Sequence, residues 1–220
     1  MAASPIERMI SLVAPPLCAA CGSHRPLGAV ICERCDGDLA GAPAVIEPGP
    51  PGVDLAVAAS PLDGVARSVV HGLKYARRLS LAQVAAAAML RTLPEFAFVH
   101  RGGEAEGRAL RVVPVPAGSW RWRWRGFDPG EEIAIAIARA GGWPLSVCLR
   151  RRGGRRQVGR RRSERLSDPP RVTLAEDPPR EALLVDDVWT TGATLSACAR
   201  ALRQGGSRRV VALTLARTVR

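Results

Sequence analysis

The 220-residue sequence lacks any apolar run long enough to span a membrane. A spanning helix needs about 18 consecutive apolar residues, and the longest candidate, 79–90, is interrupted by Ser80 and Gln83. Residues 9–17 are apolar but few, and they include two prolines, so we expect no secretory signal, no membrane insertion and a cytoplasmic location. Aromatic residues are scarce, at 4%, but an apolar fraction of 47% excludes a disordered chain.

Lysine is almost absent, because Lys74 is the only one and arginine supplies the rest of the 32 basic residues. With 20 acidic residues, they give a formal net charge of +12. The excess is concentrated between residues 117 and 165, where 13 arginines stand against 4 acidic residues. Such a local positive field attracts phosphate groups, whether on a small metabolite or on a nucleic acid.

Cysteines are few, but four of the six form two closely spaced pairs, Cys18-x2-Cys21 and Cys32-x2-Cys35. Two such pairs provide the four thiolates of one tetrahedral zinc site, and a site filled by four thiolates is structural rather than catalytic. The alternatives are a redox dithiol or a disulfide pair, and a cytoplasmic location disfavours stable disulfides. We expect His24 to lie on the surface, and Cys148 and Cys198 to be small core residues.

The rest of the chain alternates between short apolar runs and segments with helical periodicity. This alternation predicts an α/β fold with a parallel sheet flanked by helices. We expect a zinc-ribbon module at 1–45, a linker at 46–54 within the proline- and glycine-rich stretch 41–52, and one α/β domain at 55–220. The expected strands are 55–59, 110–115, 145–149, 182–185 and 210–215, and the expected helices are 65–73, 79–93, 131–140 and 193–203.

The most specific segment is the end of the strand at 182–185 and the turn that follows it. Asp186 and Asp187 come at the carboxyl end of this strand, where ligands bind in open α/β sheets. The turn 190–194 is rich in hydroxyl groups, contains Gly192 and begins a helix, so its amide groups can bind an anion. Carboxylates accept hydrogen bonds from vicinal hydroxyls or help to hold Mg²⁺. The pattern therefore indicates a ribose 5-phosphate; the alternative is a generic strand–turn–helix with an acidic helix start.

This segment resembles the phosphoribosyl pyrophosphate (PRPP) signature of type I phosphoribosyltransferases, except that Trp189 stands where a smaller aliphatic residue is usual. Nearly the whole chain is similar to the ComF family of competence-related proteins (ComFC and GntX-like). The similarity implies a type I phosphoribosyltransferase-like fold with an N-terminal zinc ribbon, and a role in DNA uptake during natural transformation. Asp128-Pro129 departs from the usual Asn-Gln, as do Arg160-Arg161 and Asp168 from the residues usual there. The motifs that carry the resemblance are the cysteine pairs, Leu73-Lys74-Tyr75, Val113-Pro114-Val115-Pro116, Arg125-Gly126-Phe127, Gln157-Val158-Gly159 with Glu164-Arg165, and the turn at 190–194.

The resemblance also assigns roles to individual residues. Asp186 and Asp187 would hold the ribose hydroxyls as the catalytic pair, with Mg²⁺ bound together with PRPP. The 5-phosphate would lie against Thr190, Thr191, Gly192, Ala193 and Thr194. The pyrophosphate loop would begin with Ala117, Gly118 and Ser119, and a lid at 150–165 would supply Arg155, Arg156, Gln157 and Arg165. Arg125 is a further candidate for phosphate contact; Lys74 either reaches a phosphate or is a solvated lysine at a helix end.

The stretch Trp120–Arg125 alternates aromatic and basic residues, which suits either stacking on single-stranded DNA or an edge strand packed on the core. A second possible function is therefore a non-catalytic module that binds single-stranded nucleic acid on the same fold. A third is docking to a helicase-type partner in the competence machinery. A lid arginine that serves a neighbouring subunit would make the protein an oligomer. The sequence identifies no acceptor substrate.

Overall fold

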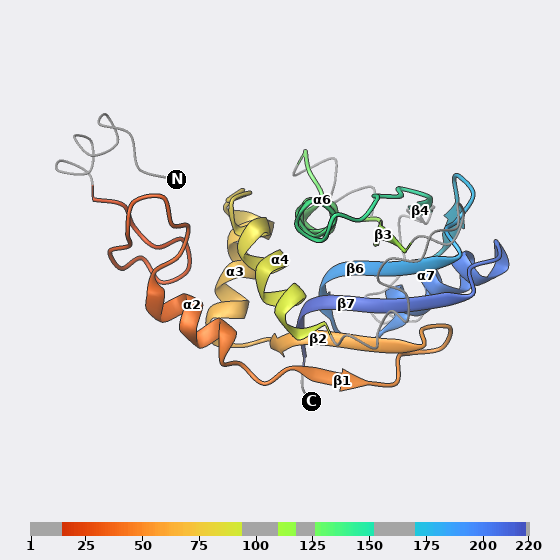
Figure 1. Ribbon diagram of the computed structural model, residues 1–220, viewed down its shortest axis with the longest axis horizontal. Helices are drawn as coiled ribbons and strands as arrows, with labels where there is room; N and C mark the ends of the chain where they lie inside the picture. The colour runs from red at the N-terminus through yellow and green to blue at the C-terminus, as the bar shows by residue number, and fades with distance from the viewer. Residues whose placement is uncertain (1–14, 94–109, 118–125, 152–169, 219–220) are drawn as a thin grey trace, which may run out of the picture.

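The computed structural model describes residues 15–93, 110–117, 126–151 and 170–218. At its centre lies a five-stranded sheet with the order β1-β2-β7-β6-β3 (Figure 1). The inner pairs are all parallel, and β1 joins β2 antiparallel at one edge. The predicted mostly parallel sheet is confirmed. The strands are β1 Val45–Glu47, β2 Leu55–Pro61, β3 Arg111–Pro114, β6 Glu181–Trp189 and β7 Arg209–Arg217.

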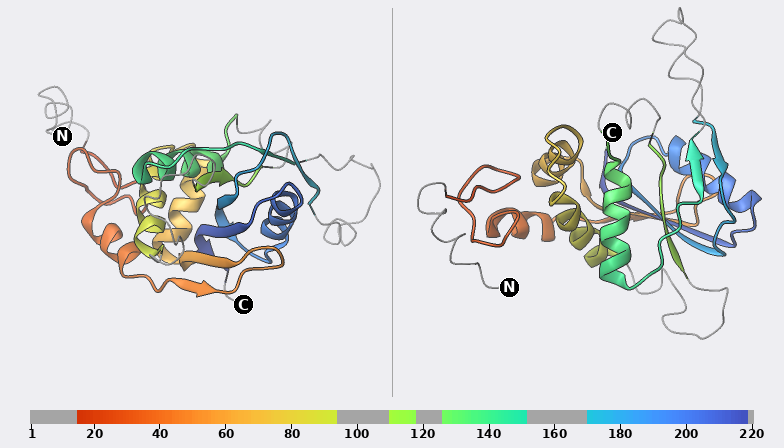
Figure 2. Two further views of the ribbon diagram at one scale, coloured as in Figure 1. Left: turned by 45° about the vertical axis from the view of Figure 1, so that its right-hand side comes forward. Right: turned by 90° about the horizontal axis from the view of Figure 1, so that it is seen from above.

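Three helices cover one side of the sheet, which we call the first face (Figure 2). They are α3 (Gly64–Tyr75), α4 (Leu81–Thr92) and α6 (Pro129–Gly141). Side chains on a strand point alternately to its two sides, so Leu183 and Val185 of β6 pack into this core. The short helix α2 (Glu33–Ala40) follows the cysteine pairs and contributes Leu39 to the same core.

The second face is covered by α7 (Ala193–Gln204) and by a hairpin of two short strands, β4 (Leu149–Arg151) and β5 (Val172–Leu174). Ala182 and Leu184 of β6 point into this core. Cys148 and Cys198 are fully buried here, which confirms that they are core residues.

Local sequence signals explain the limits of helix α6 and the position of strand β6 inside the sheet. Helix α6 starts at Asp128, whose carboxylate accepts a hydrogen bond from the amide of Gly130 at 3.0 Å, and Pro129 occupies the first turn, where its missing amide hydrogen costs nothing. The same helix ends at Gly142, which has the left-handed φ of 67° that favours glycine. Strand β6 contains an apolar run that is buried on both faces, as expected for an inner parallel strand.

Two expectations differ from the structure. The predicted strand at 145–149 is wrong: only Leu145 bridges to Val112, and β4 pairs with β5 away from the main sheet. The ladder beside β3 consists of the Pro144 carbonyl and the Ser146 amide, which bond to Val112 at 2.9 and 2.8 Å. Its next bond toward residue 149 would need the amide of residue 114 in β3, and Pro114 has no amide hydrogen. The proline- and glycine-rich stretch at 41–52 also contains β1, so part of it belongs to the sheet.

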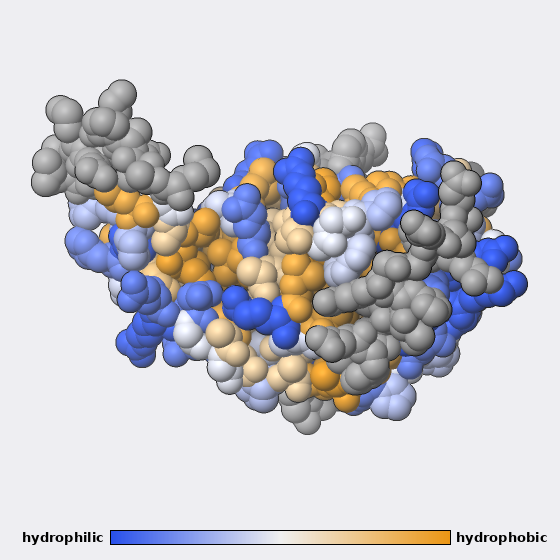
Figure 3. Space-filling view, viewed as in Figure 1, coloured by the Kyte–Doolittle hydropathy of each residue, from blue (hydrophilic) through white to orange (hydrophobic). Residues whose placement is uncertain are grey.

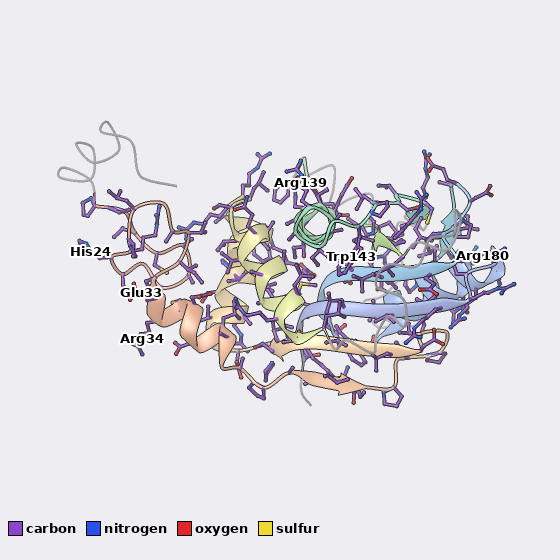
Figure 4. All side chains as sticks on the ribbon, in the orientation of Figure 1. His24, Glu33, Arg34, Arg139, Trp143 and Arg180 are labelled. Carbon is purple, nitrogen blue, oxygen red and sulfur yellow. The ribbon has the colours of Figure 1, made fainter. Side chains whose placement is uncertain are left out.

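The molecule has two different ends along the strand direction. Strands β6 and β7 begin at the end marked by Arg180, where hydrophilic residues gather, and they run toward α3 (Figures 3 and 4). More hydrophobic surface lies over the helices of the first face (Figure 3). Within the described ranges, no helix has the length and apolar character needed to cross a membrane.

Candidate functional site

The chain leaves β3 and β6 in opposite directions. After β3 it continues to α6 on the first face, whereas after β6 it continues to α7 on the second face. In an open parallel sheet, such a reversal opens a crevice outside the carboxyl ends of the two strands, and ligands bind there. The structure has a cavity of about 510 Å³ at this position, lined by residues that follow both strands.

The cavity brings together several of the predicted site residues from distant parts of the sequence. The twin acids and part of the turn that follows them form one wall, and the end of α3 forms another. The predicted residues that line it are Asp186, Asp187, Thr190, Thr194, Lys74 and Ala117.

Asp187 forms an ion pair with the only lysine of the sequence. The Nζ atom of Lys74 lies 2.6 Å from Oδ2 of Asp187, and the side chains are 22% and 10% exposed, respectively. Lys74 belongs to the last turn of α3, where the helix dipole also favours a positive charge. The sequence left two interpretations of Lys74. The interpretation as a solvated lysine at a helix end is wrong, because the carboxylate of Asp187 holds the ammonium group in the cavity.

Asp186 lies beside this ion pair, in an environment that opposes the charge of its carboxylate. Its Oδ1 atom accepts a hydrogen bond from the amide of Asp187 at 2.8 Å. Burial raises the pKa of Asp186 well above its ordinary value, and the negative charge of Asp187 raises it further. The nearby ammonium of Lys74 and the amide of Asp187 lower this pKa only in part. Asp186 therefore holds its proton more strongly than an ordinary aspartate.

Asp128 is a third carboxylate of the cavity, which the sequence analysis noted only as a departure from a family pattern. Its Oδ2 atom accepts a hydrogen bond from the amide of Ala117 at 2.8 Å, so it ties the chain that follows β3 to the start of α6. Burial raises the pKa of Asp128, and the charge of Asp187 adds to the rise. The pattern Asp-Pro-Gly-Glu-Glu signals a helix start, but only the fold shows that this start faces the twin acids.

Helix α3 contributes more residues to the cavity than the sequence indicated. Arg67 and His71 line it with Lys74, and their spacing of three to four residues places them on one side of the helix. The ring of Tyr75 lies 4.8 Å from that of His71, centroid to centroid, at an angle of 42°. The helical spacing of these polar residues was visible in the sequence, but the side of the helix that faces a ligand was not.

The turn at 190–194 has little room for larger side chains. Gly192 has a left-handed φ of 78°, and a Cβ atom there would lie 2.9 Å from Cβ of Pro50 and 3.1 Å from Nε1 of Trp189. Helix α7 starts at Gly192 without a side-chain cap, and the amide of Ala193 donates to Oγ1 of Thr191 at 3.4 Å. Thr190 and Thr194 line the cavity at the two ends of this turn, whereas Thr191, Gly192 and Ala193 are not among its lining residues.

Trp189, the residue that departs from the expected aliphatic position, is buried beneath the turn. Its side chain is 5% exposed, and the guanidinium of Arg217 lies 3.5 Å from its ring centroid. Arg217 in turn forms an ion pair with Glu47 of β1 at 2.7 Å. Glu47, Arg217 and Trp189 therefore connect the edge strand β1 to the turn. An aliphatic residue at position 189 could not form this cation–π contact with Arg217.

Several predicted residues lie outside the described ranges. They are Arg125, Gly118 and Ser119 of the loop after β3, Arg155, Arg156, Gln157 and Arg165 of the predicted lid, and the stretch Trp120–Arg125. Of the predicted lid, Arg151 at the end of β4 is described, and it lines the cavity. An arginine from this segment therefore does reach the same space as the twin acids.

The four paired cysteines form a separate cluster in the N-terminal module. The sulfur atoms of Cys18, Cys21, Cys32 and Cys35 all lie within 4.8 Å of one another, with 3.7 Å between those of Cys21 and Cys32. Four thiolates bound to one zinc at about 2.3 Å would lie about 3.8 Å apart. The amides of Ala20, Cys21 and Cys32 donate to the sulfur of Cys18 at 3.4, 3.5 and 3.3 Å, which suits a thiolate. The cluster can therefore hold a metal ion such as zinc.

The cysteine module packs directly on the helices of the first face. Three of its cysteines, together with Ile31 and Leu39, belong to the same buried core as α3 and α4. Arg78, just after α3, donates to the carbonyl oxygen of Ala19 at 2.6 Å. His24 is exposed at the outer end of the module, on the same side as Glu33 and Arg34, which confirms that it is a surface residue (Figure 4).

The chain matches no protein-family model and no curated protein. The resemblance to the ComF family therefore stays a prediction from sequence motifs, and a functional assignment depends on the geometry of the cavity.

Proposed function

We propose that this protein binds PRPP at the carboxyl edge of its sheet and transfers the phosphoribosyl group to an acceptor. One observation carries the proposal: Asp186 and Asp187 line one cavity at the crevice between β3 and β6 together with Thr190 and Thr194, the two ends of the turn that starts α7. A phosphate site next to paired carboxylates matches the two ends of a ribose 5-phosphate. The resemblance to ComF proteins favours a role alongside DNA uptake.

Recognition of the sugar follows from the chemistry of these groups. The ionised carboxylate of Asp187 accepts hydrogen bonds from ribose hydroxyls, and Asp186 contributes a second carboxyl group next to it. The 5-phosphate lies against the backbone amides and the threonine hydroxyls of the turn, where the helix dipole of α7 adds to the attraction. Gly192 permits the close approach of backbone to phosphate, because it carries no side chain.

The reaction that suits this arrangement is displacement at C1 of the ribose. A nucleophilic acceptor forms a bond to C1, the bond between C1 and the pyrophosphate oxygen breaks, and the electron pair leaves with the pyrophosphate. A nitrogen acceptor then loses its proton to solvent or to a nearby base. The carboxylates stabilise positive charge that develops on the ribose ring, and Arg151 on the cavity wall favours the negative charge of the leaving group.

Two metal ions belong to this proposal. The cavity has three carboxylates, Asp128, Asp186 and Asp187, and oxygen ligands of this kind fit Mg²⁺. When bound together with PRPP, Mg²⁺ would neutralise part of the pyrophosphate charge. In the N-terminal module, the four cysteines would hold a zinc ion with a structural role, because four thiolates leave no open position for a substrate.

Calorimetric titration of PRPP with Mg²⁺ tests the proposal. We expect binding to the wild-type protein and a loss of affinity of at least about tenfold in Asp187→Asn, which removes a charged acceptor. Gly192→Ala should also weaken binding, because its Cβ atom would push the turn away from Pro50 and Trp189.

Gly142→Ala is the matched control for the second variant. Gly142 has a similar φ of 67°, but a Cβ atom there meets nothing within 4 Å. It should reduce stability slightly without changing PRPP affinity. Absence of PRPP binding to the wild type, or equal affinities in wild type and Asp187→Asn, would contradict the proposed site.

A further inference from the structure

The ion pair of Lys74 and Asp187 lines the cavity, and the proposed function does not explain it. The two charged groups of this partly buried ion pair lie 2.6 Å apart. If they separate, each needs a new partner, because an unpaired buried charge raises the free energy of the protein. If ribose hydroxyls bind to Asp187, the ammonium group loses part of its attraction to that carboxylate. The lysine is then free to take a more negative partner from the ligand.

The position of Lys74 shows which part of the ligand it can reach. Lys74 enters the cavity from α3 on the first face, whereas the turn at 190–194 leads to α7 on the second face. The twin acids at the end of β6 lie between the two. Lys74 and the phosphate turn therefore approach the acids from opposite sides of the sheet.

The covalent structure of the ligand then fixes the chemistry on the side of the lysine. In a ribose 5-phosphate, the phosphate is attached through C5 to one side of the ring, and C1 lies on the other side. The hydroxyls of C2 and C3 lie along the edge between them. With the phosphate in the turn and the hydroxyls on the acids, C1 points away from the turn and toward the end of α3.

We propose that Lys74 selects for an activated sugar phosphate: on binding, its ammonium group moves from Asp187 to the anionic group at C1. The inference rests on the proposed function and names the part of the ligand that Lys74 recognises. Pyrophosphate at C1 carries enough negative charge to replace the carboxylate as a partner. Ribose 5-phosphate carries only a hydroxyl at C1, so Lys74 finds no anionic group to replace the carboxylate. The ammonium group then stays beside Asp187 even when ribose hydroxyls bind to that carboxylate, and the affinity is lower.

Two ligands and two variants separate this role from a structural one. Wild type, Lys74→Gln and Lys74→Arg are each titrated with PRPP and with ribose 5-phosphate, both in the presence of Mg²⁺. We expect Lys74→Gln to lose about tenfold to hundredfold in affinity for PRPP, the usual effect of removing one charged hydrogen bond. Its affinity for ribose 5-phosphate should stay the same or rise, because Asp187 is released. Lys74→Arg should retain most of the preference for PRPP.

Each other outcome overturns the inference in a recognisable way. Equal losses for both ligands in Lys74→Gln would mean that the lysine only orients Asp187, and an unchanged PRPP affinity would mean that it contacts no ligand group. Wild-type protein that binds neither ligand refutes the proposed function, and the inference with it. Thermal unfolding of each variant without ligand establishes that the fold is intact.

The exchange of partners by Lys74 can also be measured in the wild-type protein, without any substitution. Because Lys74 is the only lysine, protein labelled with nitrogen-15 at lysine Nζ gives one side-chain ammonium signal. PRPP should shift this signal strongly, whereas ribose 5-phosphate should leave it close to its position in the free protein. Equal shifts with both ligands would contradict an exchange of partners, and this readout requires no variant to fold.

Discussion

At the scale of single residues, the cavity concentrates carboxyl groups in a way that favours ligand binding over stability. Asp128 and Asp186 both have pKa values that burial raises, and the charge of Asp187 raises both further. Only Asp187 has the ammonium of Lys74 at hydrogen-bonding distance. Groups whose environment opposes their charge are common at functional sites, where the surrounding fold holds them in place.

The raised pKa of Asp186 has a consequence for stability. In the unfolded chain, an aspartate loses its proton near about pH 4. The folded chain holds this proton to a higher pH, so stability falls as pH rises from the unfolded value through the folded one. We therefore expect Asp186→Asn to raise the unfolding temperature at neutral pH and to weaken PRPP binding. Thermal unfolding at several pH values measures the first effect.

The exposed Asp177 provides the control for this prediction. Asp177→Asn removes a surface charge and should change the unfolding temperature little at neutral pH. The gain from Asp186→Asn should shrink as the pH falls and disappear below about pH 4, where the wild-type carboxyl is protonated in both the folded and the unfolded state. A gain that is constant across pH would mean that the substitution acts through packing rather than through charge.

Part of the site could be predicted from the sequence because its residues are consecutive. Asp186, Asp187 and the turn at 190–194 follow one apolar strand, so strand and helix signals alone place them at a sheet edge. Asp128 and the residues of α3 reach the cavity only through the reversal between β3 and β6. Such long-range placement depends on the strand order, which local patterns do not specify.

At the scale of elements, the cysteine pairs form one cluster, as their spacing predicted. A metal ion in this cluster would close the chain between Cys18 and Cys35 and hold α2 against α3 and α4. Helices α3, α4, α6 and α7 and strands β2, β3, β6 and β7 were also predicted within a few residues, because each has its own apolar pattern. Helix α2, strand β1 and the hairpin of β4 and β5 were not predicted. The strand expected at 145–149 is wrong because Pro114 of β3 has no amide hydrogen to continue the ladder, and because Leu149 pairs with β5 instead.

The element-scale prediction concerns the metal. The purified protein should contain about one zinc ion per chain, and Cys32→Ser should lose it, because three thiolates bind zinc more weakly than four. The metal content can be measured by elemental mass spectrometry, and a fall in the unfolding temperature should accompany the loss.

Cys148→Ser is the matched control, because Cys148 is also a buried cysteine but lies in the other core. It should retain the zinc even if it unfolds at a lower temperature. A wild-type protein without metal, or one whose cysteine pairs are oxidised to disulfides, would contradict the zinc interpretation.

At the scale of the whole molecule, the N-terminal module and the sheet share one buried core. Cys18, Ile31 and Leu39 pack in the same cluster as the helices of the first face. The boundaries expected at 1–45, 46–54 and 55–220 stay a prediction, but the shared core argues that the module is not an independent attachment. The strand β1, which follows the module, also completes the edge of the sheet.

Removal of residues 1–40 tests how far the two parts depend on each other. The truncated chain would expose apolar residues of α3 and α4 that the module covers, so we expect its unfolding temperature to fall by about 5 °C or more. Calorimetry of the full-length and truncated proteins gives the comparison. A truncated chain with unchanged stability would show that the α/β part folds as a separate domain.

The hydrogen bond from Arg78 to Ala19 lies four residues beyond Lys74, at the junction of α3 with the cysteine module. A chain that failed to acquire its metal would lose the support on which this end of α3 rests. The lysine that completes the cavity would then be displaced although no residue of the cavity had changed. Under the proposed function, loading of a metal ion into the cysteine cluster would in this way decide how much of the protein can bind PRPP.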